Sequence, residues 1–393
     1  MKKIGVITEL NPLHLGHKHI FDSIKHNNNA VICILSSNFV QRGDSAIISK
    51  FDRANMALMN GADIVIELPT PWSMSTAQNF GFGAVSLLNS LKNVDGICFG
   101  SECGDIDLLK ESADILNSEK FNLALKKETN SPESFVSIRT RVLKSIAPDC
   151  AAVLENPNDT LGIEYISASN KLNTHFEINC IKRIGASHDG DNASVTASAS
   201  DIRKHIFDND LLFAKKYMPP AAFEVLNNSN ISSIYNIENA ILANLRIKAL
   251  SGSLNNIADI SEGLENRLSD AIFNSATLDE LYKNIKTKRY PLARIRRLVL
   301  SAFLEIDNSF FGKEVPYIRV LAFNKIGEKI ISEASRKTDK PIIINGSDSK
   351  KLDGFAKKVW EKENICTDIF SLTQNSPQKC GKEYYYKIFK GEL

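Results

Sequence analysis

Two histidines near the start of the chain are spaced as HxGH, in the segment Asn11-Pro12-Leu13-His14-Leu15-Gly16-His17. An apolar run at 4–7 precedes them and predicts a strand, and a helix is expected to begin close to Gly16. A helix N-terminus presents free N–H groups and a positive dipole end, which favour an anion. The imidazoles of His14 and His17 could donate hydrogen bonds to a phosphate whose negative charge grows during nucleophilic attack, and Gly16 lets the backbone approach. The segment therefore predicts a nucleotide-handling site.

The same spacing leaves two other interpretations open. One is an ordinary helix cap with two solvated histidines. The other is metal ligation by His14, His17 and His19, which is disfavoured because the segment has neither a nearby cysteine nor an HExxH-type helix. The position of the pair, at the first turn between a strand and a helix, favours phosphate chemistry. We therefore expect no metal ligands in this segment.

The elements that would position this pair follow a regular order. Further apolar runs at 30–35, 62–68 and 96–100 predict strands, and 51–60 and 82–91 have helical spacing. This alternation predicts an α/β domain with a doubly wound parallel sheet. Helical patterns then dominate at 207–217, 221–226, 237–250, 259–275, 278–286 and 292–305, and strands return at 318–323 and 341–345. We expect a catalytic domain at 1–205, a mainly helical domain at 206–315 and a small mixed α/β C-terminal unit at 316–393.

Composition limits the class of protein. The chain has 393 residues, 43% of them hydrophobic, and a formal net charge of +2. Its apolar runs are shorter than the ~18–20 residues that cross a bilayer, so we expect a cytoplasmic protein. Seven scattered cysteines without a CxxC pair argue against a disulfide framework and a structural zinc. With so little net charge, binding to nucleic acid would need a local basic patch.

One such patch spans 286–297, where six positive side chains occur without an acidic residue. Tyr290 within it could stack on a base. The alternative, a charged and solvated helix face, stays open. The tail at 379–390, with Tyr384, Tyr385 and Tyr386, is a second candidate surface or a packed helix. We predict nucleic-acid contacts from Lys286, Lys288, Arg289, Tyr290, Arg294, Arg296 and Arg297.

Polar residues follow the predicted strands at the edge where doubly wound sheets bind ligands. The segment 41–43 and Lys50 could approach a nucleotide. Alternatively, their charged side chains could be solvated on a loop. Glu102 could orient a hydroxyl or accept a proton, or it could cap the following helix. Asp63 and Glu67 flank a buried strand, and we expect structural hydrogen bonds from them.

Longer segments resemble, in the same order, motifs of the bacterial tRNA(Met) cytidine acetate ligase family. They lie at 8–17, 37–43, 61–69 and 99–102, and further along at 157–165, 183–186, 198–203, 288–290 and 316–321. The resemblance covers residues 1 to about 325. The chain departs from the family at Ser37 and Ala322, where glycine is usual. Both departures concern loop geometry rather than the HxGH segment.

That family is part of the HxGH nucleotidyltransferase superfamily, which has a Rossmann-like fold. The resemblance implies that ATP and acetate form acetyl-adenylate, and that the acetyl group passes to N4 of the wobble cytidine in the anticodon of elongator tRNA(Met). Mg²⁺ would be bound through ATP. Adenylation of a carboxylate needs donors around the α-phosphate, and we predict His14 and His17 as this catalytic pair. The resemblance implies ATP contacts at Ile7, Thr8, Glu9, Leu10, Asn11, Pro12, Leu13, His14, Leu15, Gly16, His17, Lys18, His19, Ile20, Gly100, Asn158 and Arg183.

Several of these assignments have simpler alternatives. The segment 198–203 resembles a second phosphate-binding motif, yet a helix cap by Ser200 or Asp201 would explain it equally. Arg183 could bind phosphate oxygens or form a surface salt bridge, and Asn158 has the local pattern of a turn residue. Two other functions remain as alternatives. They are an adenylyl- or cytidylyltransferase acting on a small phosphorylated metabolite in cofactor synthesis, and an RNA-binding protein with a degenerate catalytic domain.

Overall fold

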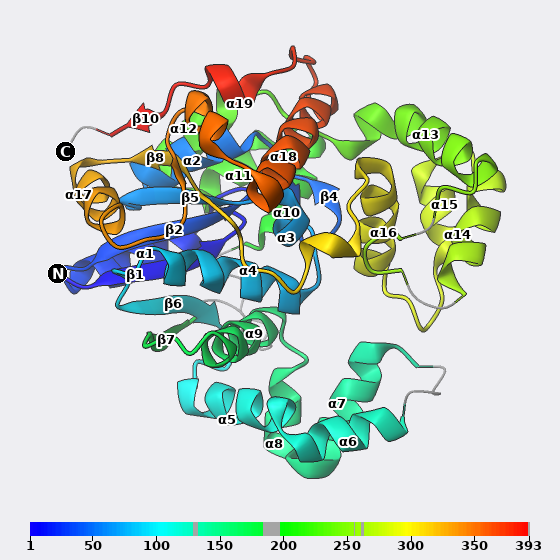
Figure 1. Cartoon of the computed structure of the whole chain (residues 1–393), viewed down its shortest axis with the longest axis horizontal. Coiled ribbons are helices and arrows are strands. Elements are labelled where there is room, and N and C mark those ends of the chain that lie inside the picture. The colour runs from blue at the N-terminus through cyan, green and yellow to red at the C-terminus, as the bar shows by residue number, and fades with distance from the viewer. Residues whose placement is uncertain (129–132, 184–196, 255, 261–262, 392–393) are drawn as a thin grey trace.

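One mixed sheet organises the protein (Figure 1). The computed structural model describes residues 1–128, 133–183, 197–254, 256–260 and 263–391. The sheet has eight strands in the order β10-β8-β5-β2-β1-β6-β7, with β9 paired to β8. The strands are β1 (Lys3–Thr8), β2 (Ala30–Ser36), β5 (Ile64–Leu68), β6 (Gly96–Ser101), β7 (Glu177–Lys182), β8 (Ile318–Phe323), β9 (Ile342–Ile343) and β10 (Phe389–Lys390).

The first five of these strands run parallel and confirm the predicted doubly wound sheet. The chain builds β1, β2 and β5 in one direction and then returns to place β6 and β7 on the other side of β1. The strand order therefore reverses between β1 and β6. Ligands of such sheets bind at this switch point, beyond the carboxyl ends of the strands. The HxGH segment directly follows β1 and lies at that point.

Helices cover both faces because the strands are apolar on both sides. All seven residues of β2 are buried. On one face, Val31, Cys33 and Leu35 pack with α1 (Leu15–His26), α2 (Lys50–Met59), α10 (Ala199–Phe207) and α12 (Pro220–Asn227). On the other, Ile32 and Ile34 join a core built with α4 (Ala77–Ser90) and α9 (Pro157–Lys171). This alternation of side chains fixes the register of the sheet.

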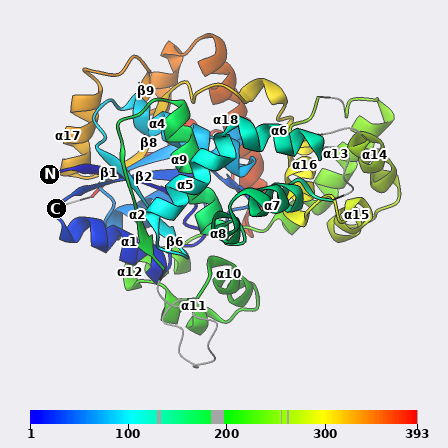
Figure 2. The same ribbon diagram turned by 90° about the horizontal axis from the view of Figure 1, so that it is seen from below.

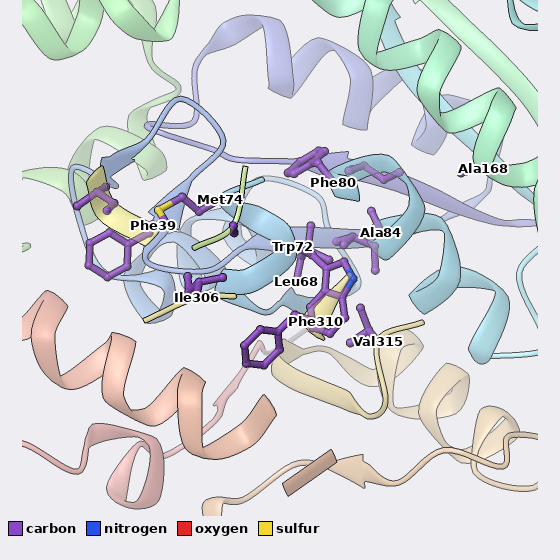
Figure 3. Packing of buried hydrophobic residues seen from close by; sticks show 14 of the residues in the cluster. Phe39, Leu68, Trp72, Met74, Phe80, Ala84, Ala168, Ile306, Phe310 and Val315 are labelled. Atoms are coloured by element: carbon purple, nitrogen blue, oxygen red, sulfur yellow. The ribbon is translucent and has the colours of Figure 1, made fainter. Parts of the chain in front are cut away.

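The core beneath α4 is extended by parts of the chain that are distant in sequence. Trp72, in α3 (Thr70–Ser73), and Phe80, in α4, lie with Phe310, in η2 (Asn308–Phe310), in one packed cluster (Figure 3). Each such large apolar side chain contributes roughly 1.5–3 kcal/mol when fully buried. The short hairpin β3 (Phe39–Val40) and β4 (Asp44–Ser45) brings Phe39 into the same core.

A helical insertion separates β6 from α9 and was absent from the predicted elements. It consists of α5 (Ile106–Asn117), α6 (Glu119–Lys127), α7 (Phe135–Ile146) and α8 (Pro148–Val153), at the bottom of Figure 1. Among the described residues, no helix is both long enough and apolar enough to cross a membrane.

The expected helices after residue 206 are present, but they form two groups. The first consists of α10, α11 (Leu211–Tyr217) and α12. Helix α12 packs against α2, and α10 and α11 lie at the bottom of Figure 2. The second consists of η1 (Ile234–Ile237), α13 (Glu238–Leu250), α14 (Leu264–Phe273), α15 (Leu278–Ile285) and α16 (Leu292–Leu304). Helices α13–α16 form a lobe at one end of the molecule, on the right in Figure 1.

The segment 316–393, expected as a small mixed α/β unit, continues the central sheet. Strand β8 pairs with β5 in antiparallel direction, and β9 and β10 pair with β8. The remaining elements are α17 (Lys325–Ala334), η3 (Gly346–Lys351), α18 (Gly354–Thr373) and α19 (Lys382–Tyr385). The apolar run 318–323 is buried throughout, so it is stable only as part of a larger sheet.

A buried ionic cluster fastens this last segment to the sheet. The Nζ of Lys50 forms ion pairs with Glu67, Glu363 (2.9 Å) and Glu383, and all four side chains are buried. The suggestion that Lys50 approaches a nucleotide is therefore wrong. Burial alone would lower the pKa of Lys50, yet the three carboxylates raise it above its usual value. Two of these carboxylates are more than 290 residues away in sequence, which is why local reasoning placed Lys50 on a loop.

Candidate active site

The two histidines are held by the helix that they begin. His14 is the N-cap of α1, and its Nδ1 accepts a hydrogen bond from the N–H of Gly16 at 3.0 Å. The backbone N–H of His14 in turn donates to Nδ1 of His17 at 3.3 Å. The ring centroids lie 4.0 Å apart. His14 is only 3% exposed, so the pair does form a cap, but His14 is not a solvated histidine.

These hydrogen bonds assign the tautomer of both rings. A neutral imidazole whose Nδ1 accepts a hydrogen bond carries its proton on Nε2. Burial, together with the charge of Arg183, lowers the pKa of His14 to about 4. Burial also lowers the pKa of His17 well below its usual value, with further contributions from His14 and Arg183. At neutral pH both rings are uncharged, and each has one N–H donor on Nε2.

The loop between β1 and α1 is fixed by three contacts from outside it. The carbonyl oxygen of Glu9 accepts a hydrogen bond from Nη1 of Arg53 at 2.6 Å. The Oδ1 of Asn11 accepts a hydrogen bond from the N–H of Ile47 at 2.7 Å. The carbonyl oxygen of Asn11 accepts another from Nη1 of Arg203 at 2.6 Å. Arg53 and Arg203 belong to α2 and α10, so helices from two parts of the chain hold the backbone that leads to His14.

Gly100 and Arg183 approach the histidines from neighbouring strands. Gly100 lies in β6, and a Cβ atom there would be 3.2 Å from Cδ1 of Ile20 and 3.6 Å from Cγ of Arg183. Arg183 follows β7, and its N–H donates to the carbonyl oxygen of Ser101 at 2.9 Å. Its positive charge lowers the pKa of both histidines. Residues of the expected set from β6, β7 and α1 therefore meet at one place. The rest of the motif at 184–186 lies outside the described residues.

Asn158 lies in the first turn of α9 rather than in an isolated turn. Its side-chain amide donates to Oε1 of Glu102, and the N–H of Asp159 donates to Oε2 of the same carboxylate at 3.0 Å. The Asp159 carboxylate accepts in return from the N–H groups of Glu102 (2.9 Å) and Cys103 (3.1 Å). Glu102 thus has a capping role, but toward α9 rather than the helix that follows it. Asp159, which sequence analysis overlooked, fixes the loop after Gly100.

The segment 198–203 forms the start of α10, and Ser198 is its cap rather than Ser200 or Asp201. The Oγ of Ser198 accepts from the N–H of Asp201 at 3.1 Å. Burial lowers the pKa of Arg203, whose guanidinium also binds the HxGH loop. Nη1 of Arg42 lies 3.4 Å from Oγ of Ser200. The loop after β3 and the N-terminus of α10 therefore meet at the edge of the site.

The basic segment 286–297 lies between α15 and the first turns of α16, and two expectations about it need correction. Tyr290 is only 7% exposed, and Arg289 and Arg294 cover its ring, so this ring is not available to stack on a base. The segment is also not free of counter-charge, because Asp259 pairs with Arg294 (3.4 Å) and Arg297 (3.2 Å). Asp259 is 35 and 38 residues away from these two arginines in sequence, so the local pattern could not reveal it.

The same segment touches the catalytic domain directly. Nη1 of Arg297 donates to the carbonyl oxygen of Gln41 at 3.1 Å, and the N–H of Gln41 donates to Oε1 of Glu9 at 2.9 Å. Gly43 has φ +72°, and a Cβ atom there would lie 2.4 Å from the backbone nitrogen of Arg297. Only glycine permits both this backbone conformation and this close approach. The helical lobe is thereby attached to the loop that borders the HxGH segment.

Comparisons with known proteins agree with this geometry. The family model described as HIGH Nucleotidyl Transferase matches residues 1–384. Proteins named tRNA(Met) cytidine acetate ligase from Thermoanaerobacter sp. (strain X514) and Thermosipho africanus (strain TCF52B) are 37% and 38% identical. The alignments cover 98% of this chain and 99% and 98% of those proteins. A crystal structure of Thermotoga maritima TmcAL bound with alpha-thio ATP is similar, with 29% identity, a TM-score of 0.90 and 99% of each chain covered. The chain belongs to the tRNA(Met) cytidine acetate ligase family of HIGH nucleotidyl transferases.

Proposed function

We propose that this protein uses ATP to activate acetate as acetyl-adenylate and then acetylates N4 of the wobble cytidine in the anticodon of elongator tRNA(Met). The relatives' names and the ATP analogue in the Thermotoga maritima structure support this function. The observation that carries it is the pair of Nε2–H donors at the switch point of the sheet, beside Arg183.

In the first step an acetate oxygen attacks the α-phosphorus of ATP, and the bond to pyrophosphate breaks. Negative charge grows on the phosphate oxygens, and fixed donors stabilise it most effectively when they need no rearrangement. His14 and His17 supply two such donors because their Nδ1 atoms are already engaged. Arg183 supplies a positive charge that acts on both imidazoles and lowers their pKa. Mg²⁺ would enter with ATP as part of the substrate, bound through its phosphates.

In the second step N4 of the cytidine attacks the acetyl carbon, AMP leaves, and the amine loses one proton. The cytidine must be unpaired to bring its N4 amine into the site. We propose that the ATP contacts extend along 7–20 to Gly100, Asn158 and Arg183. The carboxylate of Glu102 already accepts the amide N–H of Asn158, so adenosine would contact the other polar atoms of that side chain.

We also propose the helical segment 206–315, rather than the sheet, as the main tRNA-binding region. The basic residues at 286–297 would contact the RNA through Lys286, Lys288, Arg289 and Arg296. Arg294 and Arg297 are partly neutralised by Asp259 and would contribute less. The contact of Arg297 with Gln41 keeps this surface next to the HxGH loop.

The function is tested by incubating purified protein with ATP, labelled acetate and bulk tRNA. Acetylated cytidine in tRNA is the expected product. Transfer of a nucleotide to a small metabolite without RNA acetylation would instead favour the transferase alternative, and tRNA binding without turnover would favour an inactive RNA-binding protein.

Variants of the catalytic pair test the mechanism. We expect His14→Ala or His17→Ala to abolish acetate-dependent exchange of pyrophosphate into ATP, because each removes one donor to the reacting phosphate. Affinity for tRNA, measured by filter binding, should stay within about twofold of the wild type. Full acetyl-adenylate synthesis by either variant would contradict the assignment.

A further inference from the structure

One tyrosine on the surface is both fixed and half exposed. Tyr235 belongs to η1, whose neighbours Ile234 and Ile237 are buried in the core. Its own side chain is 47% exposed. The Tyr235 hydroxyl donates to Oδ1 of Asp279, in the first turn of α15, at 2.9 Å. The backbone and the hydroxyl of Tyr235 are therefore both fixed, while part of its ring is exposed to solvent.

Tyr235 and one arginine, Arg296, both contact α15. The guanidinium of Arg296 lies over the ring of Tyr282, 5.5 Å from its centroid. Asp279 and Tyr282 are three residues apart on α15 and share a face of that helix, so Arg296 lies on the same side of α15 as Tyr235. Burial and the bond to Asp279 raise the pKa of Tyr235 to about 12. At neutral pH Tyr235 is an uncharged phenol. It presents an aromatic face next to a positive charge.

A strip of positive charge continues from this point to the HxGH loop. The Cβ of Arg296 touches Gly43, where an added Cβ atom would come within 2.7 Å. Arg42, the neighbour of Gly43, is exposed and reaches Ser200 at 3.4 Å. Arg203 then binds the carbonyl oxygen of Asn11. Asp44 and Glu9 offset part of this charge, since both act on Arg203.

This arrangement fits a short single strand of RNA. Bases stack on aromatic side chains whatever their sequence, and guanidinium groups bind the phosphates between them. A cytidine whose N4 enters the site is unpaired, so its neighbours can also be splayed onto the protein. Tyr290, the tyrosine that sequence analysis selected, is buried, whereas Tyr235 is accessible.

We propose that Tyr235 is the stacking platform for a base next to the target cytidine, and that Arg42 and Arg296 bind the phosphates that join the two nucleotides. This assignment rests on the proposed function, because it takes the cytidine to be the acceptor. The competing explanation is structural, namely that the Tyr235 hydroxyl serves only to fasten η1 to α15.

Two substitutions separate these explanations. Tyr235→Phe keeps the ring and loses the bond to Asp279, whereas Tyr235→Ala loses both. The probe is an anticodon stem-loop of tRNA(Met) with 2-aminopurine beside the target cytidine, and its fluorescence falls when the base stacks. For Tyr235→Ala we expect about tenfold weaker binding, within the ~5- to 150-fold range for loss of one stacked base, and loss of the quench. Tyr235→Phe should retain both.

A matched control and a charge variant complete the design. Phe135→Ala removes a ring that is 50% exposed but belongs to α7, in the helical insertion, and it should leave binding unchanged. Arg42→Ala should weaken binding and reduce the slope of log K against log salt by about 0.7, as expected for one phosphate of a single strand.

Acetate-dependent exchange of pyrophosphate into ATP, measured without RNA, shows whether a negative result contradicts the proposed function or only the role of Tyr235. If wild-type protein shows no exchange and no RNA acetylation, the proposed function fails. If wild type is active but Tyr235→Ala binds and quenches normally, the platform is refuted. Equal weakening by Tyr235→Ala and Tyr235→Phe would also refute it, because the hydroxyl rather than the ring would then matter.

Discussion

The neutral state of His14 makes a quantitative prediction about stability and pH. Burial lowers the pKa of His14 to about 4 in the folded protein, whereas the ordinary value, expected in the unfolded chain, is 6.5. As the pH falls, the unfolded chain therefore binds the proton first. The free energy of unfolding should decrease from about pH 6.5 downward, and this decrease should be complete near pH 4.

The size of the effect follows from the difference between the two pKa values. A gap of about 2.5 units corresponds to about 3 kcal/mol below pH 4, since one unit is about 1.4 kcal/mol. At pH 5 the loss is about 2 kcal/mol, and at pH 7.5 it is close to zero. Because His14 is almost completely buried, solvent screening reduces this value little.

The substitution His14→Asn isolates this contribution. Asparagine is also a good N-cap and can accept the hydrogen bond of Gly16, but it does not titrate. Urea unfolding of both proteins at pH 7.5 and pH 5 gives the free energy of unfolding in each condition. The wild type should lose about 2 kcal/mol more than the variant, since the other titrating groups are shared. Equal losses in the two proteins would refute the buried, neutral imidazole.

Three further substitutions test the surrounding structure. Lys50→Met removes the cation that three buried carboxylates share, although Arg319 remains 3.6 Å from Glu383, and it should lower the free energy of unfolding by about 3–5 kcal/mol in urea titrations, whereas a near-neutral result would contradict the ionic cluster. Gly43→Ala places a Cβ atom 2.4 Å from the nitrogen of Arg297 and should lower tRNA affinity in filter-binding assays more than adenylate formation. Arg296→Glu should weaken tRNA binding and reduce its salt slope by about 1 without changing ATP affinity, and an unchanged slope at physiological salt would oppose a phosphate contact.

The sheet could be predicted because its signals are local. Each parallel strand is a short apolar run followed by a helical pattern. The run is continuous because such a strand is covered on both faces, and in β2 every residue is buried. The end of the chain could not be predicted in this way. The run that becomes β8 reads as a strand, but its partner β5 lies some 250 residues earlier. Pairing at that distance leaves no periodicity in the sequence.

The residues of the candidate site show the same difference between local patterns, which could be predicted, and tertiary contacts, which could not. The HxGH pair, Gly100 and Arg183 come together because each lies at or just beyond the carboxyl end of a strand of one sheet, and the ends of parallel strands meet at one edge. Residues that act through tertiary contacts were missed. Asp259 neutralises part of the basic segment, and Tyr235 replaces Tyr290 as the accessible ring. An aromatic residue between two buried isoleucines offers no sequence signal that distinguishes it from core.

Helix capping and phosphate chemistry, which compete as explanations of the HxGH sequence, depend on each other in the structure. The cap uses Nδ1 of His14, and the reciprocal bond uses Nδ1 of His17. Because these atoms accept hydrogen bonds, the proton of each ring is held on Nε2, where it can be donated to a phosphate. A histidine in the same place without the cap could adopt either tautomer. The motif therefore requires two histidines separated by two residues, since that spacing lets each imidazole be oriented by a backbone N–H of the same helix turn.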